Sequence, residues 1–194
     1  MDDRGYLGAY TENLFQPLSQ GALAAFNNGS GSELQDRAEA PAKMRALHSS
    51  SALAVNVFDY WAGQPAPLLT ALEVRAGAGE MRFEAQFPTG LGGTPPNLDV
   101  AMRWPQGTWL GIESKFTEWL TPKPPRKEHF KPKYFPLDTK QWAAKGLPKC
   151  QEVAEAVHTQ QLVYRYLDVA QLLKHALGLA TAGAPFELMY VYLD

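Results

Sequence analysis

The stretch NLDVAMRWPQGTWLGIESKF, residues 97–116, contains two runs in which apolar and other residues alternate. Alternation with a period of two is typical of β-strands, because successive side chains point to opposite faces of the sheet. The three residues between the runs, Pro105-Gln106-Gly107, are rich in turn-forming types. The sequence therefore predicts a hairpin made of strands 97–104 and 108–116.

The register of this hairpin follows from its turn. If the loop is 105–107, Trp104 faces Thr108, and the residue numbers of every directly opposed pair add up to 212. Asp99 then lies opposite Glu113, and Lys115 lies two residues further along the same face. Like charges directly opposite each other destabilise a strand pair, so two apposed carboxylates require a cation. Charges scattered over an exposed strand face would also produce such a pair, but they leave the nearby lysine unexplained.

The remaining elements are predicted from apolar periodicity. Residues 41–61 favour one or two helices with a break at HSSS, where a serine can cap a new helix, and a short helix is expected near PLLTALEV. MRFEAQF, 81–87, alternates like a half-buried strand and places Glu84 where it can add a third carboxylate. Residues 151–183 are predicted to be helical, and FELMYVYL, 186–193, to be a strand. The apolar stripe of that helix is Val163, Leu167, Ala170, Leu173, Leu177 and Ala180.

This order of elements, αβββαβ, indicates an α/β fold in which the last strand reaches the sheet through a helical crossover. Residues 1–40 lack strong periodicity and are interpreted as an N-terminal arm preceding a domain at 41–194. The length of 194 residues and 45% hydrophobic residues suffice for a proper core.

A proline-rich excursion at 121–149 interrupts the domain. It holds eight of the 18 Lys and Arg residues but two of the 20 acidic ones. Aromatic residues are interleaved with these lysines, namely Phe130, Tyr134, Phe135 and Trp142. Cationic segments with aromatics are one footprint of a polyanion-binding surface. A solvated proline-rich loop with scattered lysines fits the composition equally well.

Composition also narrows the class of protein. With a single cysteine, Cys150, no intramolecular disulfide is available, and the four histidines show no zinc-site spacing. The first residues have neither a basic region nor an apolar run, and no stretch is apolar enough to span a membrane. We therefore expect a cytoplasmic protein without a membrane partner. Motifs for nucleotide triphosphate binding and for a serine nucleophile elbow are missing.

The hairpin and the element order together resemble the PD-(D/E)XK nuclease superfamily, which has the restriction-endonuclease-like fold. The residues that carry the resemblance are Asn97-Leu98-Asp99 and, after 13 further residues, Glu113-Ser114-Lys115. The resemblance covers 41–194 and extends to uncharacterised bacterial members. One departure is that no proline directly precedes Asp99, although Pro95 and Pro96 lie close by. The fold that it implies has an αβββαβ core with a mixed sheet flanked by helices.

The resemblance also implies roles for residues. Asp99, Glu113 and the carbonyl of Ser114 would hold Mg²⁺, with Mn²⁺ as an alternative, and Lys115 would act on the attacking water or the phosphate. Glu84 would bind a second metal or position the first, and Gln171 would reach the backbone near the scissile phosphate. For Gln171 and Lys174 an ordinary solvent-facing helix side is an equal alternative. The expected nucleic-acid contacts are Lys123, Arg126, Lys127, Lys131, Lys133 and Lys174.

The function predicted on this basis is metal-dependent hydrolysis of phosphodiester bonds in DNA, with RNA as the second choice of substrate. Gln160 and Tyr164 have the Q-x-x-x-Y spacing of the exonuclease branch, a pair that also arises by chance. Two alternatives remain: a non-catalytic nucleic-acid-binding module with the same fold, and an α/β protein-interaction domain. A homodimer would suit a double-strand cut, which needs two active sites.

Overall fold

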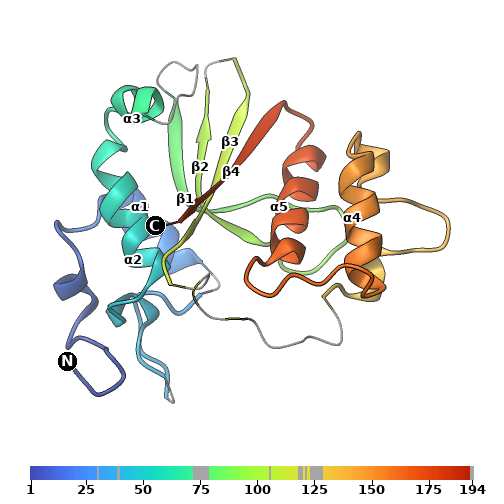
Figure 1. Cartoon of the computed structure of the whole chain (residues 1–194). Helices are drawn as coiled ribbons and strands as arrows, with labels where there is room; N and C mark the ends of the chain where they lie inside the picture. The colour runs from blue at the N-terminus through green and yellow to red at the C-terminus, as the bar shows by residue number, and fades with distance from the viewer. Residues whose placement is uncertain are drawn as a thin grey trace.

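The computed structural model describes residues 1–29, 31–38, 40–71, 79–104, 106–117, 120, 122 and 129–192 (Figure 1). Its α-helices are α1 (Gln20–Asn28), α2 (Ser50–Phe58), α3 (Ala66–Ala71), α4 (Pro148–His158) and α5 (Val169–Thr181). Its strands are β1 (Glu80–Gln86), β2 (Asn97–Arg103), β3 (Trp109–Lys115) and β4 (Phe186–Tyr192). Short 3₁₀ turns cover Tyr10–Asn13, Lys43–Arg45, Asp59–Trp61, Pro132–Tyr134 and Ala143–Lys145.

The four strands form one mixed sheet in the order β1-β2-β3-β4. β1, β2 and β3 are antiparallel neighbours, whereas β4 lies parallel to β3. The predicted crossover is confirmed, since α4 and α5 lie between β3 and β4 in the chain. Helices α1 and α2 cover one face of the sheet and α5 the other, with α4 outside α5 (Figure 1). The predicted α/β class, a mixed sheet flanked by helices, is therefore confirmed.

The core on the α1 and α2 side joins both helices to the central strands. Phe26 of α1 packs on Phe83 of β1, and Val55 and Phe58 of α2 belong to the same buried cluster as Val100 of β2. Residues 1–40 thus contribute a core helix. The expected helix break at HSSS is also present, because Ser49 caps α2 and its hydroxyl accepts a hydrogen bond from the amide of Ala52.

On the opposite face α5 lies unusually close to the strand region. A β-carbon added at Gly178 would come 2.4 Å from the carbonyl oxygen of Phe87, a distance that no real side chain adopts. Glycine at this point of α5 lets the helix backbone approach the chain that follows β1. This close approach brings α5 against the end of β1, on the face of the sheet opposite α1 and α2.

The prediction of one helix through 151–183 is wrong. The chain leaves α4 at His158, passes through Gln160 with a positive φ of 60°, and starts α5 at Val169. Asp168 caps α5 by accepting a hydrogen bond from the amide of Gln171 at 3.0 Å. Val163, expected in the apolar stripe, is 70% exposed in this connection. The apolar spacing of the sequence continues across this connection, but the cap formed by Asp168 starts a new helix there.

Candidate active site

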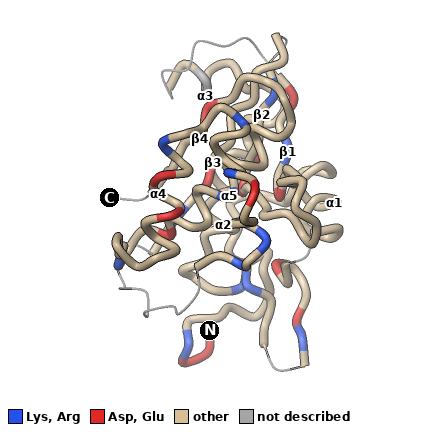
Figure 2. The backbone as a smooth tube through the Cα atoms, turned by 90° about the vertical axis from the view of Figure 1, so that its right-hand side faces the viewer, with Lys and Arg blue, Asp and Glu red and all other residues tan. Residues whose placement is uncertain are grey.

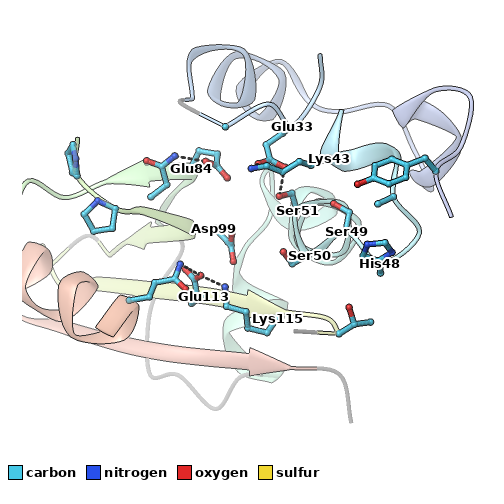
Figure 3. Close-up of a pocket in the computed structure, with 18 residues that line it drawn as sticks. Glu33, Lys43, His48, Ser49, Ser50, Ser51, Glu84, Asp99, Glu113 and Lys115 are labelled. Atoms are coloured by element: carbon cyan, nitrogen blue, oxygen red, sulfur yellow. Dashed lines mark hydrogen bonds and ion pairs between the residues drawn. The ribbon is translucent and has the colours of Figure 1, made fainter. Parts of the chain in front are cut away.

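A pocket of about 680 Å³ opens where β3 ends. Its walls come from the three antiparallel strands, the start of α2, the chain around residues 31–43 and α5. Figure 3 shows Asp99, Glu113 and Lys115 on one side of the pocket, with the start of α2 facing them. The charged residues that line it are Glu33, Lys43, Glu84, Asp99, Glu113 and Lys115.

The predicted register of the hairpin is confirmed. Val100 pairs with Ile112 and Arg103 with Trp109, so the opposed numbers add up to 212. Continuing this register places Asp99 opposite Glu113. The Oδ2 atom of Asp99 accepts a hydrogen bond from the backbone amide of Ser114 at 2.7 Å, which ties the aspartate to β3 directly beside the glutamate.

Glu113 is 1% exposed and is held from two elements. Its Oε1 atom accepts a hydrogen bond from Nζ of Lys115 at 2.6 Å and another from Nε2 of Gln171 at 2.7 Å. Its Oε2 atom lies 3.3 Å from Nε2 of His175, outside hydrogen-bond geometry. A buried charge requires such partners, because the interior solvates an ion poorly.

The electrostatics of the pocket follow from burial and from these pairings. Burial and the nearby Glu113 carboxylate raise the pKa of Asp99 well above its ordinary value. Burial also acts against the charge of Glu113, but His175 and Lys115 outweigh it and lower the pKa of this glutamate. Burial works against the ammonium of Lys115 as well, yet Glu113 raises its pKa overall. The resting pocket thus contains a tight Lys115–Glu113 ion pair beside a carboxylate that is poorly compensated.

Glu84 faces the same pocket from β1. It stands opposite Asp99 in the β1–β2 register, and its Oε2 accepts a hydrogen bond from Asn97 at 2.6 Å. Burial, and after it the charge of Glu33, raises the pKa of Glu84. Its φ is +48°, in the left-handed region that non-glycine residues rarely adopt within a strand. Such strain persists where the surroundings impose it and often marks functional sites.

Two substitutions at this position test the strain. Glu84→Gly and Glu84→Ala both remove the carboxylate, but only glycine adopts a positive φ without steric cost. We expect Glu84→Gly to be more stable than Glu84→Ala by about 1 kcal/mol, the reverse of the usual order within a strand. Urea unfolding of both variants measures this difference. An alanine variant as stable as the glycine variant would show that the backbone is not strained here.

Comparison with known families adds an independent observation. The model of the family described as "Restriction Endonuclease associating with ARP" (REase-ARP) matches residues 5–194. The chain belongs to this family. No curated protein and no solved structure matches the sequence. The REase-ARP match includes the residues before position 41, in agreement with the packing of α1 into the core.

Glu33 is a further acidic residue in the pocket of this REase-ARP chain, and the sequence pattern did not identify it. This carboxylate is buried, with Oε1 accepting from Nζ of Lys43 and Oε2 from the hydroxyl of Ser51, both at 2.8 Å. It lies in an irregular segment between α1 and α2, where no periodicity exists to indicate which way a side chain points. Figure 3 shows this group across the pocket from Lys115.

Of the phosphate contacts predicted for this REase-ARP chain, the three that the structure describes, Lys131, Lys133 and Lys174, are not part of the pocket lining. Lys133 donates to the carbonyl of Gly92, and Lys174 donates to the carbonyl of His129 at 3.1 Å. Lys131 is exposed, and Lys123, Arg126 and Lys127 lie outside the described residues. Figure 2 shows Lys and Arg interspersed with Asp and Glu along the described backbone. The role of these lysines in binding nucleic acid stays a prediction.

Three of the four aromatic residues of the excursion are buried inside the protein. Phe130, Tyr134 and Trp142 are buried against α4 and α5, and the indole Nε1 of Trp142 donates to the carbonyl of Leu173 at 2.8 Å. Of the two interpretations left open for the excursion, a polyanion surface that includes these three rings is contradicted, because apolar burial against two helices takes up their faces. The described part of 121–149 is instead anchored on α4 and α5.

Two further observations bear on metals and membranes. Within the described ranges no three His, Cys, Asp or Glu side chains are grouped closely enough to enclose a metal. The described helices also include none with the length and apolar content that a bilayer crossing requires. The cytoplasmic location expected from the sequence stays a prediction.

Proposed function

We propose that this chain is a metal-dependent nuclease of the PD-(D/E)XK type that hydrolyses phosphodiester bonds in DNA, with RNA as the second choice of substrate. The observation that carries the proposal is the apposition of Asp99 and Glu113 across the β2–β3 pair, with Lys115 at 2.6 Å from the glutamate. Membership in a family named for restriction endonucleases supports the same reading.

The donor atoms in the pocket fit a hard divalent cation. Asp99 and Glu113 line the pocket and offer carboxylate oxygens, and the backbone carbonyl of Ser114, between Glu113 and Lys115 in β3, would be a further oxygen ligand. Mg²⁺ in enzymes is commonly held by one or two carboxylates, with water and substrate phosphate completing its shell, so a closed protein cage is unnecessary. Mn²⁺ would fit the same oxygens. When bound, such an ion supplies Lewis acidity and a more acidic water.

The other residues of the pocket act around these oxygens. Lys115 would orient the attacking water and stabilise negative charge on the phosphate. Gln171 fixes the Oε1 atom of Glu113, and Glu84 lies near enough to Asp99 in register to position the cation or to hold a second one. Phosphate contacts by exposed lysines, Lys131 among them, would position the substrate without reading its sequence.

Partners are part of the proposal. The family description names association with ARP, and we extend that association to this chain. A homodimer would supply the second active site that a double-strand cut needs. Cleavage of supercoiled plasmid distinguishes a monomer from a homodimer. A monomer has one active site and nicks one strand, whereas a homodimer cuts both strands and linearises the circle.

Cleavage of supercoiled plasmid, linear duplex and single-stranded DNA in Mg²⁺, Mn²⁺ or EDTA tests the proposal. We expect cleavage that requires metal, and its loss in Asp99→Ala and Lys115→Ala. The matched control is Lys149→Ala, because Lys149 is an exposed lysine of α4 paired with Glu152 and remote from the pocket lining. A folded wild type that binds metal yet cleaves none of these substrates would contradict the nuclease, and salt-sensitive DNA binding would then favour a non-catalytic module.

A further inference from the structure

One buried titratable group next to the pocket has no role in the proposed reaction. His175 lies on α5, one turn beyond Gln171, and is 1% exposed. It falls outside the apolar stripe that the sequence predicts for this helix, yet the structure buries it between α5 and β3. Residues four apart on a helix share a face, so Gln171 and His175 approach the same strand.

Both side chains approach Glu113, and they approach different oxygens. Gln171 donates to Oε1 at 2.7 Å, whereas Nε2 of His175 lies 3.3 Å from Oε2. Within the described chain, neither Oε2 nor this Nε2 has a hydrogen-bond partner, although both atoms are buried. A buried carboxylate oxygen without a donor is costly, and the imidazole is placed to supply one after a small rotation of the carboxylate.

The Lys115 ion pair shows when that rotation is needed. Lys115 and Gln171, which both line the pocket, donate to the same oxygen of Glu113, Oε1. A cation that arrives at Oε1 must displace the ammonium of Lys115 from it. The carboxylate plane is then set by what holds Oε2, and Nε2 of His175 lies 3.3 Å from that atom.

We propose that His175 is a positioning residue that donates from Nε2 to Oε2 of Glu113 and thereby keeps Oε1 directed into the pocket for a divalent cation. This inference rests on the proposed function, because it assigns His175 to the same metal site. Groups that hydrogen-bond a metal-ligating side chain orient it, and their loss typically weakens metal binding by about 10–100-fold.

Binding of Mn²⁺, followed by electron paramagnetic resonance without DNA, tests the proposal independently of cleavage. His175→Leu keeps the volume and removes the donor, whereas His175→Gln keeps a donor. We expect His175→Leu to weaken Mn²⁺ binding by about 10–100-fold, and His175→Gln to bind close to the wild type. Leu177→Val is the matched control, because Leu177 is equally buried on α5 but belongs to the cluster around Trp142.

The outcomes separate the two claims. If His175→Leu lowers the melting temperature like Leu177→Val but binds Mn²⁺ as the wild type does, His175 is a packing residue and the inference is overturned. A wild type that binds no Mn²⁺ overturns it as well. If the wild type binds Mn²⁺ without cleaving DNA, the nuclease fails while a selective loss of Mn²⁺ binding in His175→Leu still supports the positioning role.

Discussion

Asp99→Asn is expected to abolish DNA cleavage and, in the absence of metal, to raise the melting temperature. The pKa of Asp99 is raised because the side chain is buried and lies beside Glu113. The folded state therefore binds the aspartate proton more tightly than the unfolded state does. Above the ordinary pKa of an aspartate, ionising Asp99 therefore costs more in the folded state than in the unfolded state, and this difference destabilises the fold. Asparagine removes the charge and still accepts the hydrogen bond from the amide of Ser114.

The expected gain is about 1 kcal/mol, which corresponds to roughly 2–4 °C for a domain of this size. The stability gain of Asp99→Asn should shrink as the pH falls through the raised pKa toward the ordinary value of 3.8. Asp99 of the folded wild type is then protonated, so it is as uncharged as the asparagine of the variant. Thermal melts in EDTA at neutral and acidic pH measure both effects. Mn²⁺ should stabilise the wild type but not the variant. An Asp99→Asn protein that melts below the wild type at neutral pH would contradict this account.

Lys115→Met is expected to separate metal binding from cleavage. The ammonium of Lys115 lies 2.6 Å from Oε1 of Glu113, the oxygen that we assign to the cation. Removing the lysine takes away a competing positive charge, so Mn²⁺ binding should be as tight as in the wild type or tighter. Cleavage should fall by about 10²–10⁴-fold, the range for loss of a group that assists proton transfer at the reacting centre.

Single-turnover cleavage at saturating metal, together with Mn²⁺ titration, measures the two effects. Lys149→Met is the control, since it loses the same charge from the outer surface of α4. Equal loss of metal affinity and of cleavage in Lys115→Met would mean that the lysine supports the metal ligands and does not act on the substrate. The contrast with Asp99→Asn, which should lose both functions, makes the pair of variants more informative than either alone.

Some parts of this site could be predicted from the sequence because they are local. The alternation in 97–116 and a three-residue turn suffice to place Asp99 opposite Glu113, and Lys115 follows from the same face. The parts that could not be predicted depend on residues distant in the chain. Glu33 comes from an irregular segment, which has no periodicity to indicate where its side chain points. His175 lies on a helix, but its position in the sequence does not indicate whether the imidazole faces β3 or solvent.

Apolar patterning also misled where local chemistry opposed it. Val163 and Leu167 continue the helical period across the connection between α4 and α5, yet the cap at Asp168 begins a new helix and leaves both exposed. The aromatics of the excursion suggested a binding surface, but Trp142 is buried completely. Composition does not distinguish an aromatic side chain that packs against a helix from one that meets a ligand.

The parallel pairing of β3 with β4 has a consequence for how the chain folds. β1, β2 and β3 are joined by short connections and can pair early, whereas β4 must wait for the whole crossover. Gln171 lies 58 residues beyond the glutamate that it holds. A nascent chain that has emerged only as far as the hairpin therefore carries both acidic residues without their anchor. The candidate site is therefore completed late in folding, once the crossover has docked and Gln171 holds Glu113.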